Sequence, residues 1–328
     1  MKYRNMGKYG LKLSEVSLGG WLTYGNTVEQ PDAFKCIHQA FENGVNFIDV
    51  ADIYARGKAE EVVGKVLKEE NQPRKNLVVS SKVFWPMTEN PNDVGLSRKH
   101  IMDSIDSTLE RLGLDYLDIY FCHRYDYDTP LEETILAMDD LIRSGKIHYW
   151  GTSVWSPKQL ERAYGLAKEL GAHPPAVEQP RYNMLDRFIE LELFETVKYH
   201  GMGIVVWSPL AQGLLTGKYN NGIPDDSRAK KKDFMKFLEH DLNNTETMNK
   251  LNQLGEVANE LNIKMSQLAL AWILHNEEIS SVITGATKPN QVQENVKSVD
   301  VTLKKETIDK LENILGNKPV FHGPYRPA

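Results

Sequence analysis

The sequence predicts an α/β fold, a closed (β/α)8 TIM barrel, from three observations. Short β-rich runs alternate with amphipathic helical stretches, most runs start about 30 residues apart, which is the length of a βαβ unit, and there are enough runs to close a parallel barrel. The rival is an open doubly wound sheet, whose first turn usually reads G-x-G-x-x-G, whereas this chain has Gly19-Gly20-Trp21 there. The runs begin near Val16, Asn46, Leu77, Leu117, Ile147, Ala176, Gly203 and Ser281.

Helical patterns fill the intervals between these runs. The clearest span Pro31 to Asn43, Ser97 to Leu112 and Leu131 to Arg143. Ser97 is a typical N-cap, and Gly113 a typical helix stop. We expect residues 1–328 to form one domain, because α/β barrels often exceed the usual domain length.

Three additions to the regular barrel are predicted. Residues 3 to 13 read as a small hairpin that would plug the bottom of the barrel. The seventh and eighth strands are separated by a long insertion with helices near 244–261 and 266–276, and long insertions in compact domains are usually functional. A last helix is expected at 304–315.

Composition excludes several other classes of protein. The chain of 328 residues is 41% hydrophobic with a formal net charge of −6, so it lacks the basic footprint of a nucleic-acid binder. It has no apolar run of membrane-spanning length, and residues 1–10 carry no apolar signal segment. Cys36 and Cys122 form no metal-type or C-x-x-C cluster. We therefore expect a cytoplasmic protein with no membrane insertion, no nucleic-acid partner and no metal site.

Polar residues stand at the ends of three successive predicted strands, where the side chains of a barrel converge on one mouth. The second strand ends in Asp49 and leads to Tyr54, the third ends in Lys82, and the fourth ends in His123. Each has an ordinary alternative: a helix cap, a half-exposed loop tyrosine, a strand-end surface lysine and a core histidine. Their shared position at one end of adjacent strands favours a catalytic set.

The chemistry of these four residue types fits carbonyl reduction. A tyrosine has a pKa of about 10 and stays protonated at neutral pH, and a nearby lysine cation would lower that pKa. We expect Tyr54 to be the general acid, Lys82 to tune it, Asp49 to pair with Lys82, and His123 to orient the carbonyl oxygen. Cys122, next to His123 on the strand, should point into the core.

At these positions the chain resembles the aldo-keto reductases. F-I-D-V-A-D-I-Y (47–54) is similar to the family's D-x-A-x-x-Y segment, and L-D-Y-L-D-I-Y-F-C-H (114–123) to the segment that ends in the catalytic histidine. More closely, the chain resembles the branch of voltage-gated potassium-channel β subunits and their bacterial relatives, through the segments Y-W-G-T-S-x-W-S (149–156), W-S-P-L-A-x-G (207–213), G-K-Y-x-x-G-I-P (217–224) and I-L-G-N-K-P (314–319). Some channel β subunits carry asparagine where this chain has His123, which favours a working reductase.

The resemblance implies an NADPH/NADP+ site without a Rossmann motif. Ser153 and Gln179 would hold the nicotinamide carboxamide, Trp207 would stack on the ring, and Gly20, Trp21 and Asp49 would complete that pocket. At the pyrophosphate and the adenosine end the resemblance implies Ser208, Pro209, Leu210, Ala211, Gly213, Lys218, Arg228, Gly285, Thr287, Gln291, Glu294 and Asn295. Many family members have arginine where this chain has Gln291, so the preference for NADPH over NADH rests on Arg228 and Thr287.

The substrate mouth is expected to include Trp21, Tyr54, Trp85, His123 and Trp155, although aromatic residues are equally common as rim packing. The preferred function is NADPH-dependent reduction of aldehydes or ketones, with a small-molecule carbonyl substrate. The alternative is a nucleotide-sensing regulatory subunit on the same fold, because fold does not fix function. A metal-dependent hydrolase lacks clustered ligands. The resemblance also implies a possible homo-oligomer.

Overall fold

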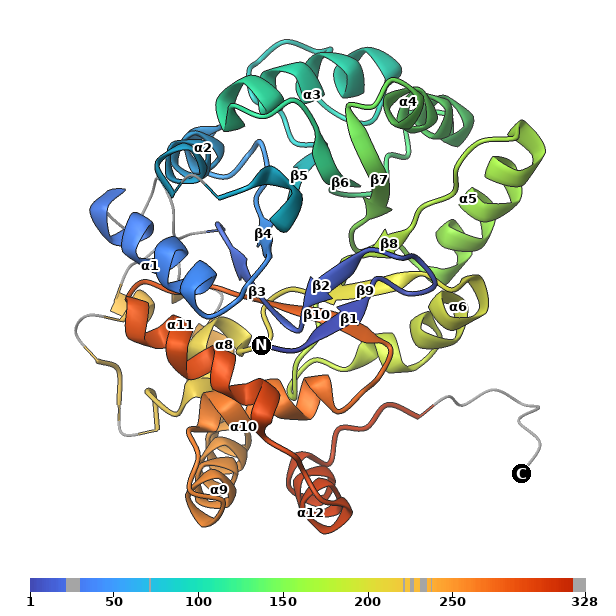
Figure 1. The fold of residues 1–328 in the computed structure, drawn as a ribbon. Helices are drawn as coiled ribbons and strands as arrows, with labels where there is room; N and C mark the ends of the chain where they lie inside the picture. Colours follow the sequence, from blue (N-terminus) through green and yellow to red (C-terminus); the bar gives the residue numbers. More distant parts are fainter. Residues whose placement is uncertain are drawn as a thin grey trace.

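Eight parallel strands close into a barrel in the computed structural model, which describes residues 1–21, 30–70, 72–220, 222–224, 227–230, 235–236 and 238–320 (Figure 1). Around the barrel the strands follow in chain order, with β10 pairing with both β3 and β9. The predicted fold class is therefore confirmed. The barrel strands are β3 (Val16–Gly19), β4 (Phe47–Asp49), β5 (Val78–Val83), β6 (Leu117–Cys122), β7 (Ile147–Thr152), β8 (Val177–Glu178), β9 (Gly203–Val206) and β10 (Ile279–Thr284).

Helices follow the strands and cover the outside of the barrel (Figure 1). Ser97 caps α3 by accepting a hydrogen bond from the His100 backbone, and Gly113 ends it with a φ of 64°. Ser156 and Gln159 form a capping box on α5. The helices that follow the eight strands are α1 (Gln30–Glu42), α2 (Lys58–Glu70), α3 (Arg98–Leu112), α4 (Leu131–Arg143), α5 (Pro157–Leu170), α6 (Leu193–His200), α10 (Met265–Leu274) and α11 (Pro289–Val296).

The pleat of each strand decides which side chains face the barrel interior, because alternate residues point to opposite faces. On β6, Ile119 and Phe121 belong to the interior apolar cluster, whereas Tyr120 and Cys122 pack in the outer core beneath the helices. On β5, Val78 belongs to the interior cluster and Val79 and Val83 to the outer one. Cys122 is fully buried and points into the core, as predicted.

A two-stranded hairpin lies against the amino-terminal end of the barrel. Its strands are β1 (Tyr3–Asn5) and β2 (Lys12–Ser14), paired antiparallel. Met6 and Leu13 are fully buried in the interior cluster together with Phe47. The predicted hairpin and its place at the bottom of the barrel are therefore confirmed.

The insertion between β9 and β10 and the last helix also lie where the sequence predicts them. The described part of the insertion contains three short 3-10 or helical turns, η3 (Ala211–Thr216), η4 (Arg228–Lys230) and α8 (Glu239–Leu242), then α9 (Thr245–Glu260) and α10. The chain continues beyond α11 through η5 (Lys297–Asp300) to α12 (Lys305–Leu315). Two further 3-10 turns are η1 (Arg74–Asn76) and η2 (Phe188–Glu190). Within the described ranges, no helix combines the length and apolar character needed to cross a membrane.

Candidate active site

A cavity of about 1040 Å³ opens at the carboxyl ends of the barrel strands. That volume is at the upper end of small-molecule sites, and the carboxyl ends of the strands are where barrel enzymes place their active sites. Most residues expected at the catalytic, cofactor and substrate positions line it. These are Trp21, Asp49, Tyr54, Trp85, His123, Ser153, Gln179, Trp207, Ser208, Pro209, Leu210, Gly213, Lys218, Gly285, Thr287, Gln291, Glu294 and Asn295.

Asp49 and Lys82 form a buried ion pair at the floor of this cavity. The Lys82 Nζ donates to Asp49 Oδ2 at 2.6 Å and to the Val50 carbonyl oxygen at 2.7 Å. The other carboxylate oxygen of Asp49 accepts hydrogen bonds from Ser80 Oγ at 2.7 Å and Gln179 Nε2 at 3.0 Å. Burial lowers the pKa of Lys82, and the Asp49 carboxylate opposes that change. The expected pairing is thus present, and Asp49 does not cap a helix.

Tyr54 follows this pair in a tight turn at the end of β4. Ala55 and Arg56 have positive φ angles of 50° and 51°, and Gly57 follows at 85°. The turn places the Tyr54 ring with its centroid 4.9 Å from the Lys82 Nζ. Such strained backbone is typical of functional sites.

The electrostatics of Tyr54 correct one expectation. We expected Lys82 to lower the pKa of the phenol, but burial raises the pKa of Tyr54 well above its ordinary value, the Asp49 carboxylate raises it further, and the Arg124 guanidinium opposes them. The physical reason is that Asp49 lies within 2.6 Å of the Lys82 ammonium and offsets its charge. Tyr54 is therefore a protonated phenol across the neutral range.

His123 faces Tyr54 across the cavity floor. The two rings meet edge to face with centroids 5.9 Å apart, and the Trp85 ring also meets the imidazole edge to face, at 6.4 Å. Burial lowers the pKa of His123 well below its ordinary value, and the Lys82 and Arg124 cations lower it further. The ring is therefore neutral at physiological pH. Its Nδ1 is buried and has no hydrogen-bond partner within the described ranges.

The residues expected at the nicotinamide lie beside this set. Ser153 Oγ donates to the Gln179 carbonyl oxygen at 2.9 Å, and the Gln179 side chain reaches Asp49. Trp21 and Trp207 face each other edge to face across the cavity at 6.4 Å. Amide, hydroxyl and aromatic groups together can bind a flat ring that carries a carboxamide.

Strained backbone continues into the loop after β9. Ser208, Ala211 and Gln212 all have positive φ angles, of 52°, 46° and 56°. Gly213 has a φ of 102°, a conformation that strains residues with a side chain, so glycine is strongly favoured there. Ser208, Gln212 and Gly213 of this loop line the cavity, so its backbone lies close to the cavity space.

The far end of the cavity lies at the start of α11. Gln291 accepts hydrogen bonds from the Thr287 backbone at 2.8 Å and from its hydroxyl at 3.2 Å, so it holds the turn that begins the helix. A helix N-terminus favours anionic groups. The side chain of Arg228, the other residue expected at the 2′-phosphate, lies outside the described part of the structure.

Four expected residues with described positions do not reach the cavity surface, and one of them is Lys82, which is fully buried beneath Asp49. Gly20 is buried and donates its backbone N–H to the Asp49 carbonyl oxygen at 2.8 Å. Ala211 is buried in the outer core. Trp155, expected at the substrate mouth, is instead packed against Tyr125 with ring centroids 4.8 Å apart and is only 2% exposed. Trp155 follows Val154, which has a positive φ of 60°.

The cavity also contains cationic residues that the sequence analysis missed. Arg124 and Arg181 line the reactive end, and Lys264 and Lys288 line the end near α11. Arg124 directly follows His123, the predicted end of the fourth strand, which was a usable signal, whereas Arg181 lies three residues beyond the end of β8. Lys264 could not be found in this way, because it reaches the cavity only through the packing of the insertion. Among the described residues, no group of three His, Cys, Asp or Glu side chains could hold a metal ion.

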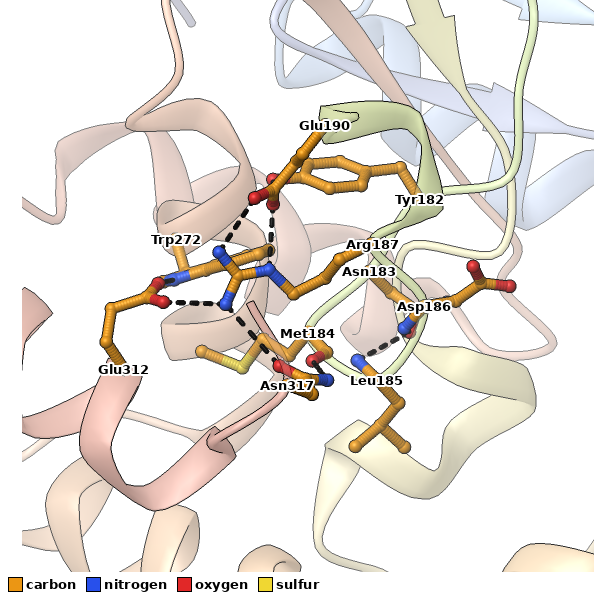
Figure 2. Close-up of polar contacts among 10 residues, drawn as sticks. All are labelled: Tyr182, Asn183, Met184, Leu185, Asp186, Arg187, Glu190, Trp272, Glu312 and Asn317. Carbon is orange, nitrogen blue, oxygen red and sulfur yellow. Dashed lines mark hydrogen bonds and ion pairs between the residues drawn. The ribbon is translucent and has the colours of Figure 1, made fainter. Parts of the chain in front are cut away.

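The loop after β8 is anchored by Arg187 (Figure 2). Its guanidinium donates two hydrogen bonds to Glu190, at 2.8 and 2.9 Å, and one to Glu312 of α12 at 2.7 Å. In the same loop, Asn183 donates to the Ser208 carbonyl oxygen at 3.0 Å. The outer helix α12 is thereby connected to the cavity wall through side-chain hydrogen bonds.

Fold and site together define a (β/α)8 barrel whose carboxyl-end cavity lies over a tyrosine, a lysine–aspartate pair and a histidine. A family model described as "Aldo/keto reductase family" matches residues 15–315. The chain belongs to the aldo/keto reductase family, which supports an oxidoreductase-type function.

Two plant proteins are similar over the whole chain. A "Probable voltage-gated potassium channel subunit beta" of Arabidopsis thaliana is 44% identical over 330 residues, covering 99% of this chain and 100% of that protein. A protein of the same description from Oryza sativa subsp. japonica is 43% identical with the same coverage. The likeness to channel β subunits noted in the sequence is therefore confirmed.

Proposed function

We propose that this protein is an NADPH-dependent reductase of aldehydes and ketones. The observation that carries the proposal is the cavity floor, where the phenol of Tyr54 lies over the buried Lys82–Asp49 pair and faces the neutral ring of His123. Family membership supports the oxidoreductase class. Tyr54 would be the catalytic acid, and the other three residues would hold and polarise the reacting groups.

The residues present fit a nicotinamide dinucleotide. Ser153, Gln179, Trp21 and Trp207 surround a space for a flat ring, and the loop 207–218 follows it with glycine and positive-φ backbone where a pyrophosphate would approach closely. Thr287, Lys288 and the start of α11 would favour a 2′-phosphate, which supports NADPH over NADH. When bound, the dinucleotide supplies the hydride for the carbonyl carbon.

The chain's own residues would manage the proton and the carbonyl oxygen. Because Tyr54 keeps its proton across the neutral range, it can donate that proton to the oxygen as negative charge develops there. A neutral His123 has one N–H available to hydrogen bond to the same oxygen and orient it. Lys82 would stabilise the phenolate left behind.

Removing the phenolic oxygen tests the proposal directly. Tyr54→Phe should lower kcat for a panel of aldehydes at least 100-fold, because general acid catalysis typically contributes that much. Binding of NADPH should persist, because the residues expected to hold it are unchanged. Trp21 and Trp207 would report this binding through their fluorescence. NADPH oxidation at 340 nm measures the first effect, and fluorescence titration with NADPH and with NADH measures the second.

Tyr199→Phe is the matched control, because Tyr199 is 80% exposed on α6 and far from the proposed chemistry. It should reduce aldehydes at the wild-type rate. A wild-type kcat in Tyr54→Phe would remove the basis for the catalytic assignment.

A second candidate function is a nucleotide-sensing regulatory subunit; the two plant relatives are described as probable channel β subunits, which favours the subunit part of this alternative. Bound NADPH without turnover of any aldehyde would support it. Formation of a homo-oligomer and a cytoplasmic location remain predictions from the sequence, which size-exclusion chromatography with light scattering and cell fractionation would test.

A further inference from the structure

Arg124 lines the cavity at the end that contains Tyr54 and His123. It directly follows His123, donates a hydrogen bond to the His123 carbonyl oxygen, and lines the cavity with Tyr54 and Trp85. Its guanidinium carbon lies 5.8 Å from the centre of the Trp85 ring, so the indole holds the cation at the mouth. The side chain therefore points at the space that a substrate would fill.

Within the described residues, no carboxylate forms an ion pair with Arg124. Other partly buried arginines of the barrel do have such partners: Arg111 pairs with Glu60 at 2.6 Å, and Arg74 pairs with Asp118 at 2.6 Å. A half-buried cation without a carboxylate at ion-pair distance is costly, because it has lost part of its hydration and the His123 carbonyl oxygen replaces only part of it. A ligand with negative charge would supply that partner.

The charges around Arg124 make this end of the cavity positive. Arg181 lies across the cavity, with its guanidinium carbon 5.9 Å from the centre of the Trp207 ring, and it is paired with Asp186 at 3.1 Å. Of the acidic residues that line the cavity, Asp49 is bound to Lys82 and Glu294 lies at the α11 end. The Arg124 charge also opposes the rise in the pKa of Tyr54 and adds to the fall in the pKa of His123, so it acts at the reacting centre.

We propose that the carbonyl substrate carries an anionic group, a carboxylate or a phosphate, and that Arg124 binds this group while Tyr54 and His123 hold the carbonyl. The proposal rests on the reductase function and names the substrate class of the same site. A guanidinium suits both anions, because its planar N–H groups can donate two parallel hydrogen bonds. The preference for charged over neutral substrates would come from an ion pair between the anionic group of the substrate and the Arg124 guanidinium.

Matched pairs of substrates test this. Succinic semialdehyde is compared with butanal, and glyceraldehyde 3-phosphate with glyceraldehyde, so that the two arms separate carboxylate from phosphate. We expect wild-type kcat/KM to favour the charged member of at least one pair by tenfold or more, since hydrogen bonds to charged groups contribute that much. In Arg124→Gln this preference should fall at least tenfold, and Arg124→Lys should keep part of it, because charge remains without the planar fork.

Arg162→Gln is the matched control, because Arg162 is exposed on α5. It should keep the wild-type preference. A wild-type enzyme that reduces neutral and charged members equally, or a preference that survives in Arg124→Gln, would overturn the proposal while leaving the reductase function intact.

A binding measurement decides the case even without turnover. With NADP+ present, succinate should quench the fluorescence of the cavity tryptophans, and Arg124→Gln should weaken its binding at least tenfold. Equal binding of succinate by both proteins would overturn the proposal, whereas absence of turnover with every aldehyde would count against the reductase function separately.

Discussion

Several candidate site residues follow inward-pointing apolar residues at a spacing of two. Asp49 follows Phe47, His123 follows Phe121, Gln179 follows Val177, and each preceding residue lies in the interior cluster. This alternation is readable in the sequence, which is why the Asp49, Lys82 and His123 positions could be predicted. The pKa direction of Tyr54 could not, because it depends on how closely Asp49 offsets Lys82.

Glu178 is a buried carboxyl group on the outer face of β8, away from the barrel interior. It lies between Val177 and Gln179 and points outward, where its carboxyl group accepts hydrogen bonds from the Thr152 hydroxyl and, at 3.2 Å, from the Trp155 backbone. Burial raises the pKa of Glu178 to about 7. The group therefore keeps a proton in the folded protein at pH values where the unfolded chain has released it.

This difference predicts how stability depends on pH. Between the ordinary glutamate pKa and about 7, the folded protein binds more protons, so the contribution of Glu178 is present at low pH and is lost as pH rises to about 7. Glu178→Gln removes this loss. The difference in free energy of unfolding between Glu178→Gln and the wild type should therefore change in favour of the variant by up to roughly 3 kcal/mol between pH 5 and pH 8, since each pKa unit corresponds to about 1.4 kcal/mol.

Urea midpoints at both pH values measure the effect. Glu169→Gln, at an exposed position of α5, is the control and should follow the wild type at both pH values. A constant difference between Glu178→Gln and wild type across this range would contradict the assigned proton.

At the scale of elements, loops determine where sequence reasoning failed. Trp155 was expected at the substrate mouth, but it follows Val154, which has a positive φ of 60°, and its side chain is buried in the core. Non-glycine residues seldom adopt that conformation, so no residue pattern announces it. Regular elements such as α4 matched their predicted bounds, because periodicity and end signals define them.

The loop after β8 gives a prediction at this scale. Arg187 is 4% exposed and holds Glu190 and Glu312, so Arg187→Met would leave two partly buried carboxylates unpaired (Figure 2). We expect a loss of roughly 3 kcal/mol in the free energy of unfolding. Binding of NADPH should also weaken, because Asn183 of the same loop holds the Ser208 carbonyl.

Chemical denaturation and fluorescence titration measure the two effects. Arg98→Met is the matched control, since Arg98 is 49% exposed and pairs with the exposed Asp140. That pair should contribute less than about 1 kcal/mol. An equal loss in both variants would show that the Arg187 network does not stabilise the loop.

At the scale of the whole molecule, the βα period was sufficient to predict a closed barrel and its additions. The hairpin, the insertion and α12 lie where the sequence placed them. The path of the insertion could not be predicted from the sequence. Lys264 and Ser266 line the cavity only because long-range packing brings them there. That residues 1–328 fold as one domain stays a prediction.

The hairpin should also stabilise the whole barrel. Leu13 is fully buried in the interior cluster, so Leu13→Ala would leave a cavity at the bottom of the barrel. We expect a loss of about 2–5 kcal/mol in the free energy of unfolding. Leu170→Ala, at a position that is 39% exposed, should cost much less, and thermal unfolding compares the two. Similar melting temperatures for both variants would mean that the hairpin is a surface appendage.

Because Met6 and Leu13 fill the amino-terminal end of the barrel, both the cofactor and the substrate would reach the cavity of the described residues from the carboxyl ends of the strands. When two ligands reach a cavity from the same side, the ligand that binds nearer the entrance covers the one that binds deeper. Whichever lies deeper must enter first and depart last. Initial-rate and product-inhibition patterns of this protein should therefore be those of an ordered sequence of arrivals, a kinetic property that follows from the hairpin at the opposite end.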